Sequence, residues 1–289
     1  MARNGLRLIA DVGGTNARFA LAGPAGAIGA VSTLPVSGYE TFAAALAAYL
    51  KTSGARPNAA AAAAAGPHDG DGVRLTNAAW TIRSRDITAA LGGAPAAVFN
   101  DLEAVALALP YLNDADLDLL RAGKAPPDAP RLAFNVGTGL GAAVAVSLGG
   151  GQWRALATEA GHMRFASVDA ADALIAPHVT TYEDTLSGRG FQLMQRLLPD
   201  AGERRRVFSR LLGRVAGDLI VATGAWGGLY LCGGVLDDWT ANIDMTAFRQ
   251  ALQDKGPMAG RMAALPVARI IRPAPALLGL AHAPIPGAG

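Results

Sequence analysis

The stretch from Ile9 to Gly23, IADVGGTNARFALAG, decides how the chain begins to fold. One apolar run ends at Gly13-Gly14 and a second apolar run follows, which predicts two strands joined by a tight glycine turn. The stretch from Phe134 to Ser147, FNVGTGLGAAVAVS, repeats this pattern of strand, glycine turn and strand. We therefore expect two related lobes, each with one such hairpin.

Glycine turns of this kind suit an anionic ligand, because glycine permits positive φ and lets backbone N–H groups approach a phosphate closely. A P-loop does not fit, since none of the three lysines lies near a glycine turn. A dinucleotide fingerprint leads into a helix, whereas both turns here lead into a strand. Ordinary β-hairpins remain the alternative for either turn alone. A third glycine pair, Gly233-Gly234, favours a nucleotide held between the two lobes.

The composition limits the class of protein. Of 289 residues, 51% are apolar and 17% are charged, and the net charge of +2 gives no reason to expect a nucleic-acid partner. The single cysteine, Cys232, excludes an intramolecular disulfide and fits a reducing compartment. The sequence shows neither a signal peptide nor an apolar run of membrane-spanning length. We expect a soluble cytoplasmic protein without a membrane partner.

Strand-like and helix-like segments alternate along most of the chain, which predicts an α/β architecture. The Pro-rich segment 116–131 is the best candidate for a lobe boundary. The expected small lobe comprises residues 1–110 and 271–289, and the expected large lobe comprises residues 111–270.

Two segments allow more than one interpretation. The alanine run that begins at Ala59 and precedes Gly66-Pro67 fits either a helix or a buried strand of small residues. The basic segment 203–214, ERRRVFSRLLGR, has apolar residues between its arginines, so we expect it to form the solvated face of a helix.

Two acidic positions follow apolar strands. A carboxylate at the end of such a strand is costly to bury without a cation or hydrogen-bond donors. Asp11 could bond the N–H groups of its own turn, or it could hold Mg²⁺ through water beside phosphates. Asn100-Asp101 could cap the helix that follows, or Asp101 could act as a base toward a hydroxyl group.

Seven motifs, in this order, resemble those of the bacterial glucokinase family: DVGGTNARFAL, LTNAAW, FNDLEAVALALP, GTGLGAA, EAGH, LSGRG and LYLCGGV. This family is part of the superfamily of sugar kinases, heat-shock proteins and actin. The resemblance implies an α/β protein with a two-lobed, actin-like ATPase (ribonuclease H-like) fold and an active site in the interlobe cleft. It also implies transfer of phosphate from ATP, with Mg²⁺, to the 6-hydroxyl of glucose, and a homodimer.

The resemblance also gives roles to particular residues. Asp101 would be the catalytic base. The sugar ligands would be Asn100, Glu159, His162, Glu183, Thr76 and Asn77. The first phosphate loop would comprise Asp11, Gly13, Gly14, Thr15 and Asn16, with Asp11 holding Mg²⁺ through water. Gly137, Thr138 and Gly139 would bind the β- or γ-phosphate, and Gly233 and Gly234 would lie against adenosine.

Several of these roles have local alternatives. Asp184 is the alternative to Glu183, and Arg18 could form a structural ion pair or contact phosphate. Glu159 and His162 could belong to an ordinary polar loop, although a zinc site lacks enough neighbouring ligands. Arg189 stands where the family often has proline.

Other functions remain open at the level of sequence. Discrimination among hexoses depends on pocket shape, so another sugar is an alternative, as is polyphosphate as the donor. A sugar-sensing regulator would need a DNA-binding helix-turn-helix, for which the first strand, starting near Leu6, leaves no room. An actin-like assembling ATPase would lack the combination of Asn100-Asp101, Glu159 and His162.

Overall fold

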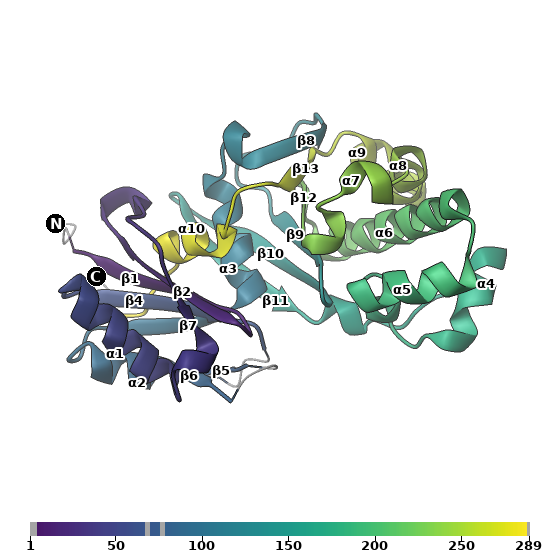
Figure 1. Ribbon diagram of the computed structural model, residues 1–289. Coiled ribbons are helices and arrows are strands. Elements are labelled where there is room, and N and C mark those ends of the chain that lie inside the picture. Colours follow the sequence, from purple (N-terminus) through teal and green to yellow (C-terminus); the bar gives the residue numbers. More distant parts are fainter. Residues whose placement is uncertain (1–4, 67–69, 76–78, 288–289) are drawn as a thin grey trace. The chain divides into compact units, whose positions relative to one another are not determined.

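The computed structural model describes residues 5–66, 70–75 and 79–287 (Figure 1). The chain divides into two compact units. Unit 1 comprises Met1–Leu112, Leu148–Ala155 and Arg272–Gly289, and unit 2 comprises Asn113–Ser147 and Leu156–Ile271. Each unit has its own sheet and helices, which confirms the predicted α/β architecture. Within the described residues, no helix is both long and apolar enough to cross a membrane.

The sheet of unit 1 has the strand order β3-β2-β1-β4-β7. Its strands are β1 (Arg7–Val12), β2 (Asn16–Ala22), β3 (Ser32–Pro35), β4 (Ala59–Ala64) and β7 (Ala96–Asn100), and a separate small hairpin pairs β5 (Gly72–Arg74) with β6 (Thr81–Arg83). β1, β4 and β7 are parallel, whereas β2 is antiparallel to both β1 and β3. The carboxyl ends of β1, β4 and β7 therefore lie along one edge of this sheet.

The helices of unit 1 cover both faces of this sheet (Figure 1). They are α1 (Phe42–Ser53), α2 (Ser84–Ala90), α3 (Asp101–Ala108) and α10 (Pro275–His282). The alanine run forms the buried strand β4, which lies between β1 and β7. Alternate alanines pack in the core cluster that includes Phe19, Phe42 and Leu46, while α3 and α10 also pack against β4. Tertiary burial on both faces outweighs the helix propensity of alanine here.

The six-stranded sheet, which belongs to unit 2 except for Leu148–Ala155 at the end of the β10-β11 hairpin, has the strand order β11-β10-β9-β12-β13-β8. Its strands are β8 (Leu117–Arg121), β9 (Arg131–Val136), β10 (Leu140–Gly149), β11 (Gln152–Thr158), β12 (Leu229–Cys232) and β13 (Val267–Ile270). In each unit the first strand of the glycine hairpin (β1 or β9) pairs with the second strand on one side and with a parallel strand (β4 or β12) on the other. The repeated sequence pattern thus corresponds to a repeated sheet topology.

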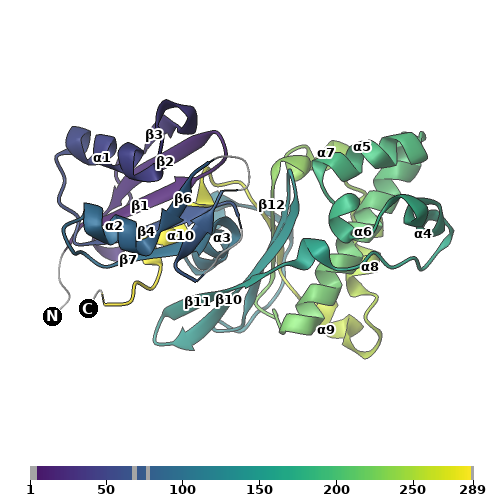
Figure 2. The ribbon, with the colours of Figure 1, turned by 90° about the horizontal axis from the view of Figure 1, so that it is seen from below.

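The helices of unit 2 gather on one side of its sheet (Figure 2). They are α4 (Ala170–Ile175), α5 (Gly188–Leu197), α6 (Ala201–Thr223), α7 (Trp239–Asn242), α8 (Met245–Gln253) and α9 (Ala259–Ala263). Apolar residues of α6, among them Phe208 and Leu212, are fully buried in one cluster with Leu132 and Phe134 of β9.

The basic segment on α6 corrects one expectation from the sequence. Arg210 and Arg214, one helical turn apart, both form ion pairs with the fully buried carboxylate of Asp172 at the start of α4. The nitrogen–oxygen distances are 2.8 and 2.7 Å. Part of the predicted solvated face is therefore an interior ion-pair network, because a buried carboxylate is costly unless it is paired.

Candidate active site

Two carboxylates of unit 1 lie at the carboxyl edge of its sheet. Asp11 is next to the end of β1, and Asp101 follows β7 as the first residue of α3. Arg18 lies directly opposite Asp11 in the β1-β2 register, with 3.3 Å between Arg18 Nη1 and Asp11 Oδ2. Burial raises the pKa of Asp11, and the charge of Arg18 partly opposes that effect.

Asp101 has the properties of a base that works near neutral pH. The pKa of Asp101 is raised to about 6: burial has the largest effect and the negative charge of Asp11 acts in the same direction, while a hydrogen bond from the Leu102 N–H (2.9 Å) opposes both. A general base is most effective when its pKa lies near the working pH. The two carboxylates are thus electrostatically coupled, and Asp101 holds a proton more tightly than an exposed aspartate does.

Asn100 rather than Asp101 is the N-cap of α3. Its Oδ1 accepts from the Leu102 N–H at 2.9 Å, and its backbone N–H donates to Glu103 Oε2 at 2.8 Å, which together form a capping box. Its Nδ2 also donates to the Gly66 carbonyl at 3.1 Å. The capping role that the sequence left open for this pair is therefore filled by Asn100, and Asp101 is not needed for it.

The glycine turns have the predicted form. Gly13, Gly14 and Thr15 connect β1 to Asn16, the first residue of β2, and the Gly13 N–H donates to the Asn16 carbonyl at 2.9 Å. Gly137, Thr138 and Gly139 form the second turn, where the Gly137 N–H donates to the Gly139 carbonyl at 2.9 Å.

Gly233 and Gly234 follow β12, the strand beside β9. Gly233 has a φ of 105°, and a Cβ there would collide with the Val136 carbonyl oxygen. Only glycine fits this position, because it combines a left-handed backbone with close backbone approach. The predicted adenosine motif therefore packs directly against the second glycine hairpin within unit 2.

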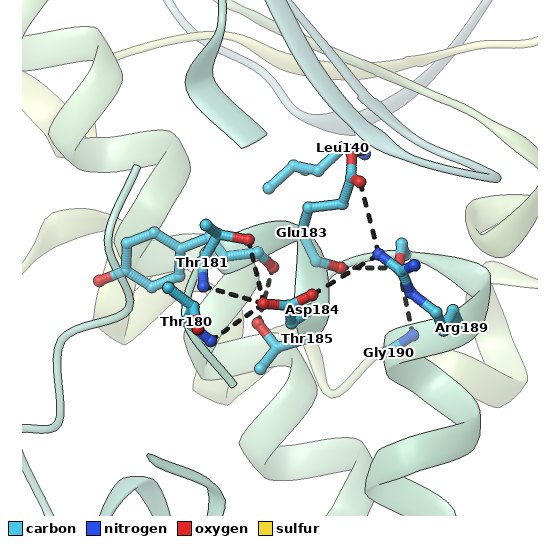
Figure 3. A network of polar contacts seen from close by, with 10 residues as sticks. Leu140, Thr180, Thr181, Glu183, Asp184, Thr185, Arg189 and Gly190 are labelled. Carbon is cyan, nitrogen blue, oxygen red and sulfur yellow. Dashed lines mark hydrogen bonds and ion pairs between the residues drawn. The ribbon is translucent and has the colours of Figure 1, made fainter. Parts of the chain in front are cut away.

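The two neighbouring acids Glu183 and Asp184 lie on the short 3₁₀ helix Tyr182–Asp184 and have different partners (Figure 3). Asp184 accepts from the N–H groups of Thr180 and Thr181, both at 3.0 Å, and these bonds hold its pKa below the ordinary value. Glu183 points to the second hairpin, where its Oε2 accepts from the Leu140 N–H at 3.0 Å. Of the two acids, Asp184 stabilises its own turn, and Glu183 reaches the candidate phosphate loop.

Glu159 directly precedes the short 3₁₀ helix Ala160–His162, and His162 is its last residue. Both are exposed, and neither side chain forms a hydrogen bond or ion pair with another residue that the structure describes. Between them, Gly161 is buried so closely against the Leu140 carbonyl oxygen that a Cβ would collide with it. The second hairpin and the loop with Glu159 and His162 are therefore in direct contact.

Two of the predicted sugar ligands, and a complete set of protein ligands for the predicted metal, have no counterpart among the described residues. Thr76 and Asn77 lie outside the described residues. Among the residues that are described, no group of three or more His, Cys, Asp or Glu could hold a metal ion by itself. A metal at Asp11 would therefore need most of its ligands from water or a bound phosphate.

The structure also shows a residue that motif reasoning did not connect to the site. Arg189 Nη2 lies 3.6 Å from Glu183 Oε1 and 3.5 Å from Asp184 Oδ1. The contact crosses the turn before α5, where neither helical nor strand periodicity applies. The only available signal was the departure from the family pattern at this position.

Comparison with known proteins supports the likeness seen in the motifs. The family model described as Glucokinase matches residues 8–207 and 199–284 of this chain. The chain belongs to the glucokinase family. A family member named Glucokinase from Chromobacterium violaceum is 37% identical, with 95% of this chain and 88% of the relative covered. Another from Cupriavidus pinatubonensis is 38% identical, with coverages of 96% and 91%.

Solved structures of the family agree with this fold. The crystal structure of glucokinase from an Antarctic psychrotroph has a TM-score of 0.84 and 29% identity, with 96% of this chain and 98% of that chain covered. The fold of this chain is accordingly the two-lobed α/β fold of actin-like ATPases.

Proposed function

We propose that the protein is a glucokinase, which transfers the γ-phosphoryl group of ATP to the 6-hydroxyl of glucose and yields glucose 6-phosphate and ADP. The observation that carries this proposal is Asp101, a carboxylate freed from helix capping by Asn100 and given a pKa of about 6 by burial and by Asp11. Relatives named Glucokinase, 37% and 38% identical over nearly the whole chain, support the choice of substrate.

In the proposed reaction, Asp101 accepts the proton of the 6-hydroxyl as the hydroxyl oxygen attacks the γ-phosphorus. The new bond joins this oxygen to phosphorus, and the bond between the γ-phosphorus and the bridging oxygen of ADP breaks. Most of the catalysis then comes from positioning and charge stabilisation, as in phosphoryl transfer generally. In unit 1, backbone N–H groups of the first glycine turn would hold phosphate oxygens.

The carboxylate of Asp11 fits Mg²⁺ as a hard oxygen ligand whose burial favours a neutralising cation. Bound there through water, Mg²⁺ would neutralise charge on the donor phosphates. Arg18, already paired with Asp11, would keep the carboxylate ionised and oriented.

The proposed ligands of glucose are Asn100, Glu159, His162 and Glu183, with Thr76 and Asn77 as further candidates. Vicinal hydroxyl groups both donate and accept, which suits carboxylates, an amide and an imidazole. The exposed Glu159 and His162 side chains are available for such a ligand. Gly137–Gly139 would hold the β- or γ-phosphate, and Gly233-Gly234 would contact adenosine. Homodimer formation and a cytoplasmic location complete the proposal.

The test is Asp101→Asn, which removes the proton acceptor but keeps the shape and the oxygen that accepts from Leu102. We expect kcat to fall by at least about 100-fold while the dissociation constant for glucose, measured by calorimetry, stays within about threefold. Asp86→Asn is the matched control, because Asp86 is exposed and also lies in the first turn of a helix of unit 1. An Asp101→Asn enzyme with wild-type kcat would refute the assigned base.

A further inference from the structure

The second glycine hairpin has a cluster of three charged side chains beside it. Glu183 and Asp184 carry two negative charges, and Arg189 lies between them at 3.6 and 3.5 Å (Figure 3). Among the residues that the structure describes, no other Lys, Arg or His forms an ion pair with either carboxylate. The neutralisation of these two negative charges therefore depends on the single guanidinium of Arg189.

The carboxylate of Glu183 is fixed against the hairpin backbone. Its Oε2 accepts from the Leu140 N–H at 3.0 Å. The same oxygen would lie 2.7 Å from a Cβ on Gly139 and 3.3 Å from a Cβ on Gly161. The two glycines thus leave a niche for the carboxylate, which places a full negative charge on the loop proposed to bind phosphate.

Such a charge opposes an anionic ligand. Asp184 adds a second charge, because its hydrogen bonds from Thr181 and Thr180 hold its pKa low and keep it ionised. Coulomb repulsion between a carboxylate and a phosphate close by is large unless a cation offsets it. Arg189 touches both carboxylates, so it can offset both at once.

The fold of this region does not depend on the Arg189 side chain. That side chain is 72% exposed, and exposed ion pairs contribute little to stability. The local backbone is held by other contacts: Ser187 caps α5 by accepting from the Gly190 N–H at 3.1 Å, and the Gly188 N–H donates to the Gly137 carbonyl at 2.8 Å. The effect of Arg189 on ligand binding can therefore be measured separately from folding.

We propose that Arg189 is a positioning residue for the phosphoryl donor: by bridging Glu183 and Asp184 it makes the second glycine hairpin electrostatically compatible with the phosphates of ATP. The proposal rests on the function proposed above and extends it to a residue outside the glycine loops. It acts on donor affinity, and it leaves the proton transfer at Asp101 unchanged.

The experiment compares Arg189→Gln and Arg189→Lys with the wild type. We expect Arg189→Gln to raise the KM for MgATP by about 5- to 20-fold with a much smaller effect on kcat, because one compensating charge is lost beside the phosphate loop. Arg189→Lys restores most of the affinity, since lysine keeps the charge. At about 0.5 M NaCl the difference between Gln and wild type shrinks, because salt screens exposed charges.

Arg196→Gln is the matched control. Arg196 lies on the same helix, is exposed, and is about two helical turns from Arg189. Arg196→Gln therefore removes the same charge at a greater distance from the hairpin. An equal KM for MgATP in Arg189→Gln and Arg196→Gln would overturn the proposal. So would an Arg189→Lys variant that behaves like Arg189→Gln, because the effect would then not come from charge.

Direct binding separates this proposal from the proposed function. Calorimetric titration with MgATP in the absence of sugar gives the dissociation constant for each variant. A wild type that phosphorylates no hexose, but binds MgATP with the same dependence on Arg189, overturns the proposed function and supports the role of Arg189. A wild type that binds no MgATP overturns both.

Discussion

Each glycine hairpin has two carboxylates and one guanidinium beside it, but these charged groups differ in burial and in hydrogen bonding. The first hairpin has Asp11 and Asp101 with Arg18, and the second has Glu183 and Asp184 with Arg189. At the first hairpin the carboxylates are desolvated, and their pKa values are raised. At the second, backbone N–H groups hold the pKa of Asp184 down, and Arg189 is largely exposed.

This difference suggests a division of tasks between two units of the same topology. A buried carboxylate pair with raised pKa values favours proton transfer and metal binding. A solvated cluster with one bridging guanidinium favours reversible binding of an anion. We infer that the charges beside the first hairpin serve proton transfer and metal binding, and that those beside the second serve affinity for the donor. The following predictions test that contrast, from the largest expected effect to the smallest.

Asp11→Asn should have the largest effect. The variant removes the candidate magnesium ligand and leaves Arg18 without its partner, so kcat/KM for MgATP should fall by about 100-fold, and the Mg²⁺ requirement should rise. A magnesium titration of the initial rate measures both. Adding Asn135→Asp, which puts a carboxylate at the equivalent position of the second hairpin, should not restore activity. Restoration would contradict the placement of the metal at the first hairpin.

Gly161→Ala should destabilise the second hairpin. A Cβ at this buried position would collide with the Leu140 carbonyl oxygen, and overpacking of this kind costs about 2–3 kcal/mol. Gly260→Ala on α9 is the control, because no atom lies within 4 Å of the added Cβ. The urea midpoint should fall for the first variant and stay or rise for the second. Equal midpoints would show that the packing between the hairpin and the Glu159–His162 loop is loose.

Asp101→Asn should stabilise the protein at neutral pH, although it lowers kcat by at least about 100-fold. The folded-state pKa of about 6 lies above 3.8, the ordinary value for an aspartate, so between these pH values the folded state binds more protons than the unfolded state. The contribution of the Asp101 carboxyl to the free energy of unfolding therefore falls as pH rises through that window. Its ionisation destabilises the folded state fully above pH 6. We expect the variant to gain about 2 kcal/mol at pH 7.5 and progressively less toward pH 4. Melting temperatures across this range measure it, with Asp86→Asn at an exposed position as the control.

The neighbours Glu183 and Asp184 should separate function from stability. Glu183→Ala should lower kcat/KM for glucose by about tenfold with little change in melting temperature, since its main contact is one N–H of the hairpin. Asp184→Ala should cost about 1 kcal/mol of stability through the lost bonds from Thr180 and Thr181, with activity nearly kept. The reverse pattern would show that Asp184 is the ligand.

The sequence predicted the features that depend on local pattern. Both hairpins and the α/β alternation follow from strand periodicity and short turns. For Arg18 the sequence left an ion pair and a phosphate contact open, and the structure supplies the ion-pair partner, because the antiparallel register places Arg18 opposite Asp11. The family resemblance was enough to predict the membership that the comparisons confirm. The roles of individual site residues stay predictions.

Features that depend on long-range packing escaped prediction. The alanine strand β4 could be distinguished from a helix only by its burial between β1 and β7. Glu183 was preferred to Asp184 through the family resemblance alone, and its contact with Leu140, more than 40 residues earlier in the chain, could not be predicted. Arg210 and Arg214 seemed to be surface residues, because nothing in α6 indicates that Asp172 is buried beside them. Each case needs a partner that the local sequence does not contain.

The most direct test of the central claim is a product assay with the wild-type protein, MgATP and a panel of hexoses, with polyphosphate as an alternative donor. The proposed function predicts that glucose is turned over with equimolar release of ADP and glucose 6-phosphate, and that other hexoses react more slowly. ADP release that no hexose accelerates would contradict it.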